Sequence, residues 1–185
     1  MAEKKILINV FHPRMEQSRG NKAMIEAVSD MPNVTVRNLY EEYPDFKINA
    51  AKEQELLVAH DVIVFQHPLF WLSSPALFKE WQDTVLQKGF AFPPGEGEKL
   101  AGKIWQTALT VGGPAEGYTK DGPFKADFED ILIPLRLTAT YCSMQWQPVF
   151  AITSVMPEAD QWMRAISADE LKEKVAEYRT LLESF

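Results

Sequence analysis

Short apolar segments, separated by segments of helical length, are the feature that most limits how this chain can fold. Residues 6–11 (ILINVF) are almost entirely apolar, which is typical of a parallel strand buried on both faces of a sheet. Residues 62–66 (VIVFQ) form a second such run, and residues 104–111 a third. Along the whole chain, the predicted strands are 6–11, 34–39, 62–66, 104–111 and 144–151, and the predicted helices are 20–29, 50–58, 75–86, 124–140 and 168–185.

The alternation of strand and helix predicts a doubly wound parallel sheet with helices on both faces. Five strands favour the flavodoxin-like order 2-1-3-4-5, a three-layer α/β sandwich, over a six-stranded dinucleotide-binding fold. The chain has no internal repeat or linker, so residues 1–185 are expected to form one domain. In such sheets the ligand binds beyond the carboxyl ends of the strands, where the order switches between strands one and three.

Prolines and serines predict where several elements begin and end, because proline interrupts sheets and helix interiors and serine caps helices. The expected boundaries are a strand end at His67-Pro68, an N-cap at Ser74, a kinked or restarted helix at Pro134, an irregular segment at 40–49 and a capping box at Ser167 and Glu170. These boundaries place an aromatic-rich turn, residues 69–72, between the third strand and its helix.

Composition limits the partners and the compartment. A net charge of −7, without a basic stripe, argues against nucleic acid as a partner. The single cysteine, Cys142, forms no internal disulfide and suits a reducing compartment. Three histidines and no Cys-x-x-Cys pair argue against a protein-bound metal. The sequence shows no signal peptide, and its apolar runs fall short of the ~20 residues of a membrane span, so a soluble, cytoplasmic protein is expected.

Three segments are expected to line the ligand crevice: residues 12–21, 68–72 and 110–118. In the first, a helix N-terminus offers unpaired N–H groups and a positive dipole end, which together hold phosphate. Ser18 can add a hydroxyl donor and Gly20 can allow a close backbone approach, although Ser18 can also be a simple N-cap. His12 can reach a phosphate or a loop carbonyl, and its place directly after the first strand favours the ligand.

The second and third segments suggest a planar ligand. Phe70 and Trp71 can form one wall of a slot for a ring system, or they can pack on a neighbouring helix or a partner subunit. Gly112 and Gly113 let main-chain N–H groups approach a ligand edge and stabilise negative charge there, and the alternative is a flexible connection. Of the remaining histidines, His67 is expected to be structural, and His60 is expected to lie in solvent at a helix end.

The run HPLFWLSSPALFKEW…VLQKGFAF, with TVGG and Tyr118 downstream, resembles the flavin-dependent NAD(P)H:quinone reductases of the flavodoxin-like superfamily. Residues 39–57 (LYEEYPDFKINAAKEQELL) and 66–68 (QHP) are most similar to the bacterial ancillary proteins of glutathione-regulated potassium-efflux systems. The resemblance spans essentially the whole chain.

The resemblance implies a flavin site, with FMN favoured and FAD possible, and NADH or NADPH as the hydride donor. The flavin phosphate site falls on His12, Ser18, Arg19, Gly20 and Asn21. The isoalloxazine site falls on Pro68, Leu69, Phe70, Trp71 and Leu72, together with Thr110, Val111, Gly112 and Gly113. Tyr118 falls on the tyrosine that helps the family to bind and activate quinone.

Two positions depart from the family pattern. The FAD-type enzymes place a histidine six residues after that tyrosine, and this chain has Phe124 there. Proton support for the reduced flavin must then come from Tyr118, water or another group, which leaves room for slow turnover or a different substrate. Val111 replaces the second residue of the usual Thr-Thr-Gly-Gly run, so the main-chain donors remain and a hydroxyl is lost.

The implied reaction is a two-step hydride transfer: NAD(P)H reduces the flavin and leaves, and a quinone then enters the same slot, which predicts ping-pong kinetics. A rival role is a regulatory subunit that docks on a potassium-efflux antiporter at the inner face of the membrane, and both roles can coexist. A flavodoxin-like electron carrier is disfavoured, because a carrier needs no nicotinamide pocket. The family, together with the aromatic residues Trp71, Phe90 and Phe92, also implies a homodimer.

Overall fold

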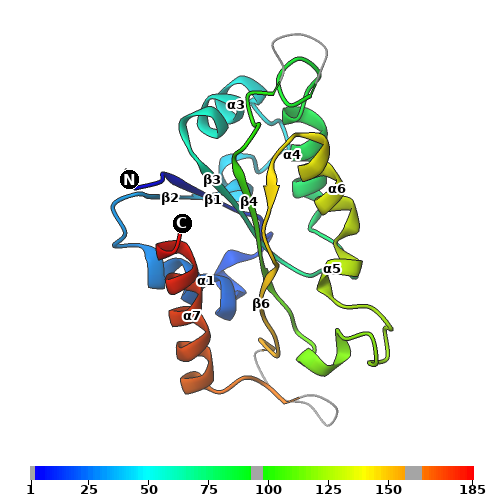
Figure 1. Cartoon of the computed structure of the whole chain (residues 1–185). Helices are drawn as coiled ribbons and strands as arrows, with labels where there is room; N and C mark the ends of the chain where they lie inside the picture. Colours follow the sequence, from blue (N-terminus) through cyan, green and yellow to red (C-terminus); the bar gives the residue numbers. More distant parts are fainter. Residues whose placement is uncertain (1–2, 93–97, 157–163) are drawn as a thin grey trace.

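A computed structural model describes residues 3–92, 98–156 and 164–185 of the protein. Six parallel strands form one sheet in the order β2-β1-β3-β4-β5, and β6 also pairs with β4. Helices lie on both sides of the sheet (Figure 1). The flavodoxin-like fold and the strand order predicted from the sequence are therefore confirmed.

The strands are β1 (Ile6–Val10), β2 (Val34–Asn38), β3 (Val62–Pro68), β4 (Ile104–Thr110), β5 (Gln145–Trp146) and β6 (Phe150–Ile152). The α-helices are α1 (Arg19–Val28), α2 (Leu39–Glu42), α3 (Ala50–Ala59), α4 (Ala76–Val85), α5 (Phe128–Ile131), α6 (Ile133–Tyr141) and α7 (Ala168–Glu183). Two short 3-10 turns, η1 (Met15–Gln17) and η2 (Ala115–Gly117), follow β1 and β4. None of the helices in the described parts of the chain is both long and apolar enough to cross a membrane.

Two hydrophobic cores, one on each face of the sheet, hold the layers together. Alternate residues of β1 point to opposite faces, so Ile6 packs with α1 and α7, and Leu7 packs on the side of α3, α4 and α6. The core around Leu7 is aromatic. Phe65 of β3 lies between Phe78 of α4 and Trp105 of β4, with ring centroids 4.9 and 4.1 Å away. Figure 1 shows α1 and α7 side by side on their face, which sets the position of the N-terminus of α1.

Strand β3 extends beyond the predicted break and includes His67 and Pro68. Pro68 pairs in register with Thr110 of β4. A residue before proline favours extended backbone, and proline at a strand end removes only one donor, so the strand tolerates this pair. The aromatic turn begins at Leu69, whose N–H donates to the Thr110 carbonyl over 2.9 Å.

The predicted last strand, residues 144–151, is two short strands in the structure. β5 pairs with the start of β4, and β6 pairs with its end. Pro148 lies between them and has no N–H to give to a sheet ladder. The Gln106 side chain donates from Nε2 to the Pro148 carbonyl (3.0 Å), so a side chain holds the interruption against β4.

Helix α4 begins differently from the prediction. Its N-cap residue is Pro75, which makes no side-chain capping bond, so Ser74 does not cap the helix. The Leu77 N–H donates instead to the hydroxyl of Tyr40 (3.3 Å), which comes from α2, a short helix at the start of the segment predicted to be irregular. A side chain 37 residues away in sequence therefore satisfies a first-turn amide of α4.

Two other predicted boundaries are confirmed. Pro134 lies in the first turn of α6, directly after α5, and so restarts the helix. Residues 124–127 precede α5 and are not helical, so the predicted helix was too long at its start. Ser167 caps α7 in a capping box, in which the Glu170 N–H donates to the Ser167 hydroxyl (3.2 Å).

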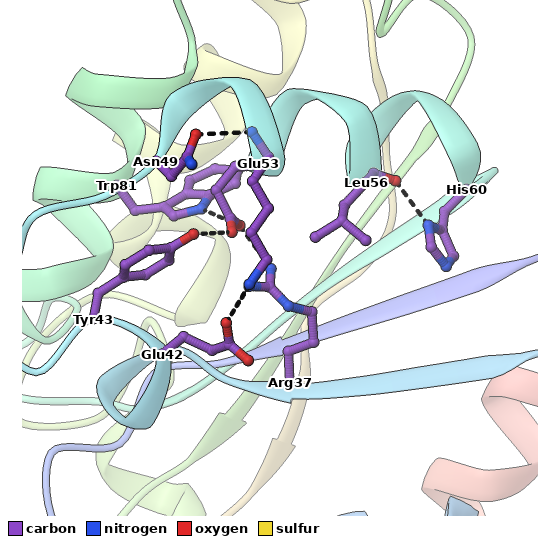
Figure 2. Close-up of polar contacts among 9 residues, drawn as sticks. Arg37, Glu42, Tyr43, Asn49, Glu53, Leu56, His60 and Trp81 are labelled. Atoms are coloured by element: carbon purple, nitrogen blue, oxygen red, sulfur yellow. Dashed lines mark hydrogen bonds and ion pairs between the residues drawn. The ribbon is translucent and has the colours of Figure 1, made fainter.

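A buried carboxylate joins β2, α3 and α4 (Figure 2). Glu53 of α3 accepts hydrogen bonds from the Arg37 guanidinium (2.8 Å), the Tyr43 hydroxyl (2.6 Å) and the Trp81 indole N–H (2.9 Å). Glu53 is 1% exposed, so these donors replace the water that an ionised carboxylate requires. Burial and the Glu53 carboxylate raise the pKa of Tyr43 to about 12, which keeps the phenol a donor at neutral pH.

His60 is buried, although its place at a helix end predicts exposure to solvent. It is the C-cap residue of α3. Its Nδ1 lies 2.7 Å from the Leu56 carbonyl (Figure 2), and because a carbonyl only accepts, Nδ1 carries the proton. Its Nε2 lies 3.2 Å from the Thr35 hydroxyl. These two contacts tie the end of α3 to β2, which the local sequence does not indicate.

Candidate functional site

The three predicted crevice segments meet at the carboxyl ends of β1, β3 and β4. Phe11, directly after β1, donates its N–H to the Gln66 carbonyl of β3 over 2.8 Å. The bond from Leu69 to the Thr110 carbonyl joins the second segment to the end of β4. The His12 ring lies edge-on to Phe70, with ring centroids 6.1 Å apart. The three segments therefore lie together at the carboxyl ends of the strands, as the topology predicts; they are residues 12–21, 68–72 and 110–118.

The first segment ends at the N-terminus of α1. Ser18 is the N-cap residue, and its hydroxyl oxygen accepts the Asn21 N–H over 3.2 Å. The amides of Arg19 and Gly20 lie in the first turn, where N–H groups have no intrahelical partner and carry the positive end of the helix dipole. This arrangement suits an anion. It is compatible with both interpretations of Ser18, because an oxygen that caps the helix still has its hydrogen to donate.

Arg19 and Gly20 make contacts that the sequence does not suggest. The Arg19 guanidinium donates to the Ile166 carbonyl, just before α7, over 2.7 Å. A Cβ on Gly20 would lie 2.8 Å from Cγ2 of Thr110 and 3.1 Å from Cγ1 of Val155. The missing side chain therefore lets α1 pack against the end of β4, so the close approach at Gly20 is that of a helix to a strand.

His12 is partly buried and donates from only one ring nitrogen. Burial and the neighbouring Arg14 lower the pKa of His12. Its Nδ1 accepts the Arg14 N–H over 3.2 Å, which requires an unprotonated nitrogen. The proton of the neutral ring then lies on Nε2. That atom is the donor available to a ligand or to a loop carbonyl, the two partners that the sequence suggests.

The aromatic segment forms a two-residue turn that exposes its central side chains. Phe70 and Ser73 exchange two backbone hydrogen bonds, each 3.0 Å long. Trp71 and Leu72 lie between them with φ angles of 49° and 57°, a left-handed pair for which Asn-Gly is preferred. The Trp71 indole is 99% exposed, which excludes packing on a helix of its own chain. A strained turn that holds an aromatic ring in solvent suggests contact with a ligand or a partner.

The glycine loop after β4 is tied to the segment that follows β6. Val111 donates its N–H to the Ile152 carbonyl (2.9 Å), and Ser154 donates to the Gly113 carbonyl (3.0 Å). A Cβ on Gly112 would lie 3.0 Å from Sδ of Met156, so this position is also closely packed. Bonds on both sides of the glycine pair hold the loop in place, which argues against a flexible connection.

Tyr118 packs against this glycine loop. A Cβ on Gly113 would lie 3.1 Å from the Tyr118 hydroxyl. The Tyr118 ring stacks on Phe128, with centroids 4.8 Å apart, and packs against Phe124 at 5.4 Å. Burial raises the pKa of Tyr118, so its hydroxyl keeps its proton at neutral pH. Phe124, at the position where the resemblance places the histidine of the FAD-type enzymes, packs against the tyrosine ring and supplies no proton.

His67 is fully buried on the face of β3 that packs against α4, as expected for a structural histidine. Its ring centroid lies 5.3 Å from that of Phe78. Nδ1 lies 2.9 Å from the Pro68 carbonyl and therefore carries the proton, while Nε2 is buried without a hydrogen-bond partner among the described residues. Burial lowers the pKa of His67 to about 4.

We expect the free energy of unfolding to decrease as the pH is lowered from about 6.5 to about 4, because of His67. The unfolded chain takes up a proton near the ordinary histidine pKa, whereas the folded protein resists protonation, so each pH unit in this window costs about 1.4 kcal/mol. Urea unfolding at several pH values measures the slope. A His67→Leu variant should have a shallower slope by that amount. A variant with the slope of the wild type would contradict the assignment to His67.

Two residues beside the site were missed by sequence reasoning. Gln66 of β3 donates from Nε2 to the backbone carbonyl (3.2 Å) and the side-chain oxygen (3.1 Å) of Asn21. Tyr178 of α7 donates its hydroxyl to Gln66 Oε1 over 3.1 Å. All three side chains are fully buried. An amide in the otherwise apolar run VIVFQ is a signal that could have pointed to Gln66, whereas Tyr178 follows the ordinary apolar pattern of a helix.

Comparison with known sequences supports the earlier resemblance. A family model described as the flavodoxin-like fold matches residues 4–181. The glutathione-regulated potassium-efflux system ancillary protein KefG of Escherichia coli (strain K12 / DH10B) is 41% identical to this chain over 174 residues. The match covers 94% of this chain and 90% of that protein.

Solved structures match almost the whole chain. General stress protein 14 of Treponema denticola, solved in complex with FMN, has a TM-score of 0.87 at 32% identity and covers 97% of this chain and 98% of its own. An NADPH-quinone reductase of P. pentosaceus has a TM-score of 0.83 at 25% identity and covers 96% and 97%. A chain named thermophilic tryptophan halogenase, from Streptomycin violaceusniger, has a TM-score of 0.88 at 37% identity and covers 97% and 99%. These names differ in activity and agree in fold, and this chain therefore belongs to the flavodoxin-like fold family, with the KefG ancillary proteins among its relatives.

Proposed function

We propose that this protein is an NAD(P)H:quinone oxidoreductase that uses FMN. The observation that carries the proposal is the turn at 70–73. It holds an exposed indole at the carboxyl ends of the strands, where the N-terminus of α1 also lies. A planar ring with a phosphate tail would use both features. Support also comes from the similar structures, of which one is in complex with FMN and one is named an NADPH-quinone reductase.

The residues at this edge fit a flavin mononucleotide. The Ser18 hydroxyl and the first-turn amides of α1 suit its phosphate. Phe70 and Trp71 suit one face of a planar ring, and the amides of the glycine pair after Val111 suit a carbonyl edge that gains negative charge. A flavin bound there would supply hydride transfer between NAD(P)H and a quinone. The protein would orient that group and exclude water from one side of it.

The visible spectrum of the purified protein tests the cofactor, and mass spectrometry of what it releases on denaturation separates FMN from FAD. We expect a yellow protein that releases FMN. Initial rates with NADH or NADPH and a quinone then test the reaction, and parallel double-reciprocal lines are expected if both substrates use one slot in turn. A colourless protein that takes up neither flavin, or a flavoprotein without quinone turnover, would overturn the proposal.

Tyr118 is the residue best placed to hold a proton near a bound quinone, because its neutral hydroxyl lies against Gly113. We expect Tyr118→Phe to lower kcat with a quinone by about 10- to 100-fold. Flavin affinity should change little, because the ring and its stacking on Phe128 remain. Steady-state rates at saturating NADPH measure the effect. Tyr141→Phe, at an exposed tyrosine of α6, is the matched control, and equal loss in both variants would contradict a role specific to Tyr118.

Docking on a potassium-efflux antiporter, at the cytoplasmic face of the membrane, is a second role that can coexist with catalysis. The match with KefG over 94% of the chain favours it. The exposed side chains of Phe70, Trp71 and Leu72 form an apolar surface that suits a protein partner. Co-purification with the antiporter from membranes tests docking, and turnover by the isolated protein tests catalysis. Docking without turnover would support the regulatory role and contradict the enzymatic one.

We also propose that the protein is a homodimer and that residues 1–185 form one domain. Of the aromatic residues that suggested a dimer, Trp71 is exposed, but Phe90 and Phe92 are partly buried against the core of their own chain. The Phe92 ring lies 4.9 Å from that of Tyr141. Support for a second subunit thus rests on the aromatic turn. Light scattering should give the mass of two chains, and a mass of one chain would overturn the dimer.

A further inference from the structure

A chain of buried hydrogen bonds connects the C-terminal helix to the candidate phosphate site. It starts at Tyr178 of α7, whose hydroxyl donates to Gln66 Oε1 (3.1 Å). Gln66 Nε2 donates to the carbonyl and the Oδ1 of Asn21 (3.2 and 3.1 Å). Asn21 Nδ2 then donates to the hydroxyls of Ser18 (3.1 Å) and Thr110 (2.8 Å). Each of these five side chains is at least nine-tenths buried.

The donor and acceptor of every hydrogen bond in this series are set by backbone groups whose roles cannot reverse. The Asn21 carbonyl only accepts, so the Gln66 amide nitrogen must face it and Oε1 must face Tyr178. Tyr178 therefore donates. Because Gln66 Nε2 also donates to Asn21 Oδ1, the Asn21 amide nitrogen points to Ser18 and Thr110. A flipped Gln66 amide would place its oxygen against the Asn21 carbonyl, and a flipped Asn21 amide would place its nitrogen against that of Gln66.

This fixed direction determines what the two terminal hydroxyls can do. Ser18 Oγ accepts two hydrogen bonds, from the backbone N–H and the side-chain amide of Asn21. Its two lone pairs are then occupied, and its remaining capacity is as a donor. Thr110 Oγ1 accepts from Asn21 and likewise keeps its hydrogen. Both residues lie at the carboxyl ends of the strands, where the proposed flavin binds, so Gln66 and Tyr178 act on two hydroxyl donors there through Asn21.

We propose that Gln66 and Tyr178 are positioning residues of the flavin site: through Asn21 they make the Ser18 hydroxyl a donor to the phosphate group of FMN. The proposal rests on the proposed function. It assigns to α7 a part in cofactor binding through the hydroxyl of Tyr178. Loss of the Tyr178 hydroxyl would leave Gln66 Oε1 buried and unpaired, so the Gln66 side chain would shift and its hold on the Asn21 amide would weaken.

The test compares FMN with riboflavin, which has the same ring and lacks the phosphate. Flavin fluorescence titrations of the apoprotein measure both affinities for wild type, Ser18→Ala, Tyr178→Phe, Gln66→Met and the Ser18→Ala/Tyr178→Phe double variant. We expect about 10-fold weaker FMN binding for Ser18→Ala and about 5-fold weaker for Tyr178→Phe, with riboflavin affinity nearly unchanged. The double variant should lose only about 10-fold, because both changes act through the same donor, the Ser18 hydroxyl.

Gln66→Met keeps the side-chain length and removes all three hydrogen bonds, so it should weaken FMN binding at least as much as Tyr178→Phe. Circular dichroism and the melting temperature of each apoprotein show whether it is folded. If Gln66→Met does not fold, Tyr178→Phe alone tests the proposal. Equal losses for FMN and riboflavin, or additive losses in the double variant, would overturn the positioning role and leave the enzyme proposal standing. A wild-type protein that binds neither flavin would overturn both.

Discussion

Replacement of Glu53 by alanine is expected to lower the free energy of unfolding by about 3–5 kcal/mol. The Arg37 guanidinium, which is 8% exposed, would lose its buried partner, and the Tyr43 hydroxyl and Trp81 indole would lose their acceptor. The Glu42 carboxylate remains 3.3 Å from the guanidinium but is partly exposed, so it would offset only part of the buried charge, which water cannot reach. Urea denaturation of the purified variant, monitored by circular dichroism, measures the change.

Glu55→Ala is the matched control, since Glu55 is exposed on the same helix and its loss should change stability by less than about 0.5 kcal/mol. A double variant, Arg37→Met/Glu53→Met, removes both charges and fills their volume. It should be more stable than Glu53→Ala, because no guanidinium is then left buried without the Glu53 carboxylate. If Glu53→Ala and Glu55→Ala have similar stability, the carboxylate of Glu53 does not hold this part of the fold together.

Exchange of Trp71-Leu72 for Asn-Gly is expected to raise stability and to abolish flavin binding. Both wild-type residues have left-handed φ angles, which cost of order 1–3 kcal/mol each for residues of this kind, whereas Asn-Gly prefers this turn. We expect a gain of about 1–3 kcal/mol in the free energy of unfolding. The indole that the proposed ring site requires would be lost at the same time. Thermal unfolding and FMN titration measure the two effects.

The single variant Leu72→Gly separates strain from chemistry. It relieves the left-handed backbone at one position and keeps the indole of Trp71. We expect higher stability than wild type with little loss of FMN affinity. The reverse single variant, Trp71→Asn, should lose FMN affinity with a smaller gain in stability. If Leu72→Gly loses as much affinity as Trp71→Asn, the turn acts through its rigidity and not through the aromatic ring.

Much of the site could be located from the sequence because its position follows from topology. Apolar runs such as ILINVF identify buried parallel strands, and the carboxyl ends of such strands lie along one edge. Local signals also placed the cap at Ser18 and the restart at Pro134. Local reasoning failed at His60 and Ser74, where contacts with distant residues decide burial and capping.

By itself the sequence determined the strand order, the helices on each face and the three segments that meet at the candidate site, because hydrophobic period and turn residues act over short distances. The tertiary structure alone decided which groups at that site can donate. The bonds from Gln66 to Asn21 and from Tyr178 to Gln66 span 45 and 112 residues, and their direction is set by a backbone carbonyl of α1. Such bonds form only after α1, β3 and α7 have packed together, so no local pattern records them.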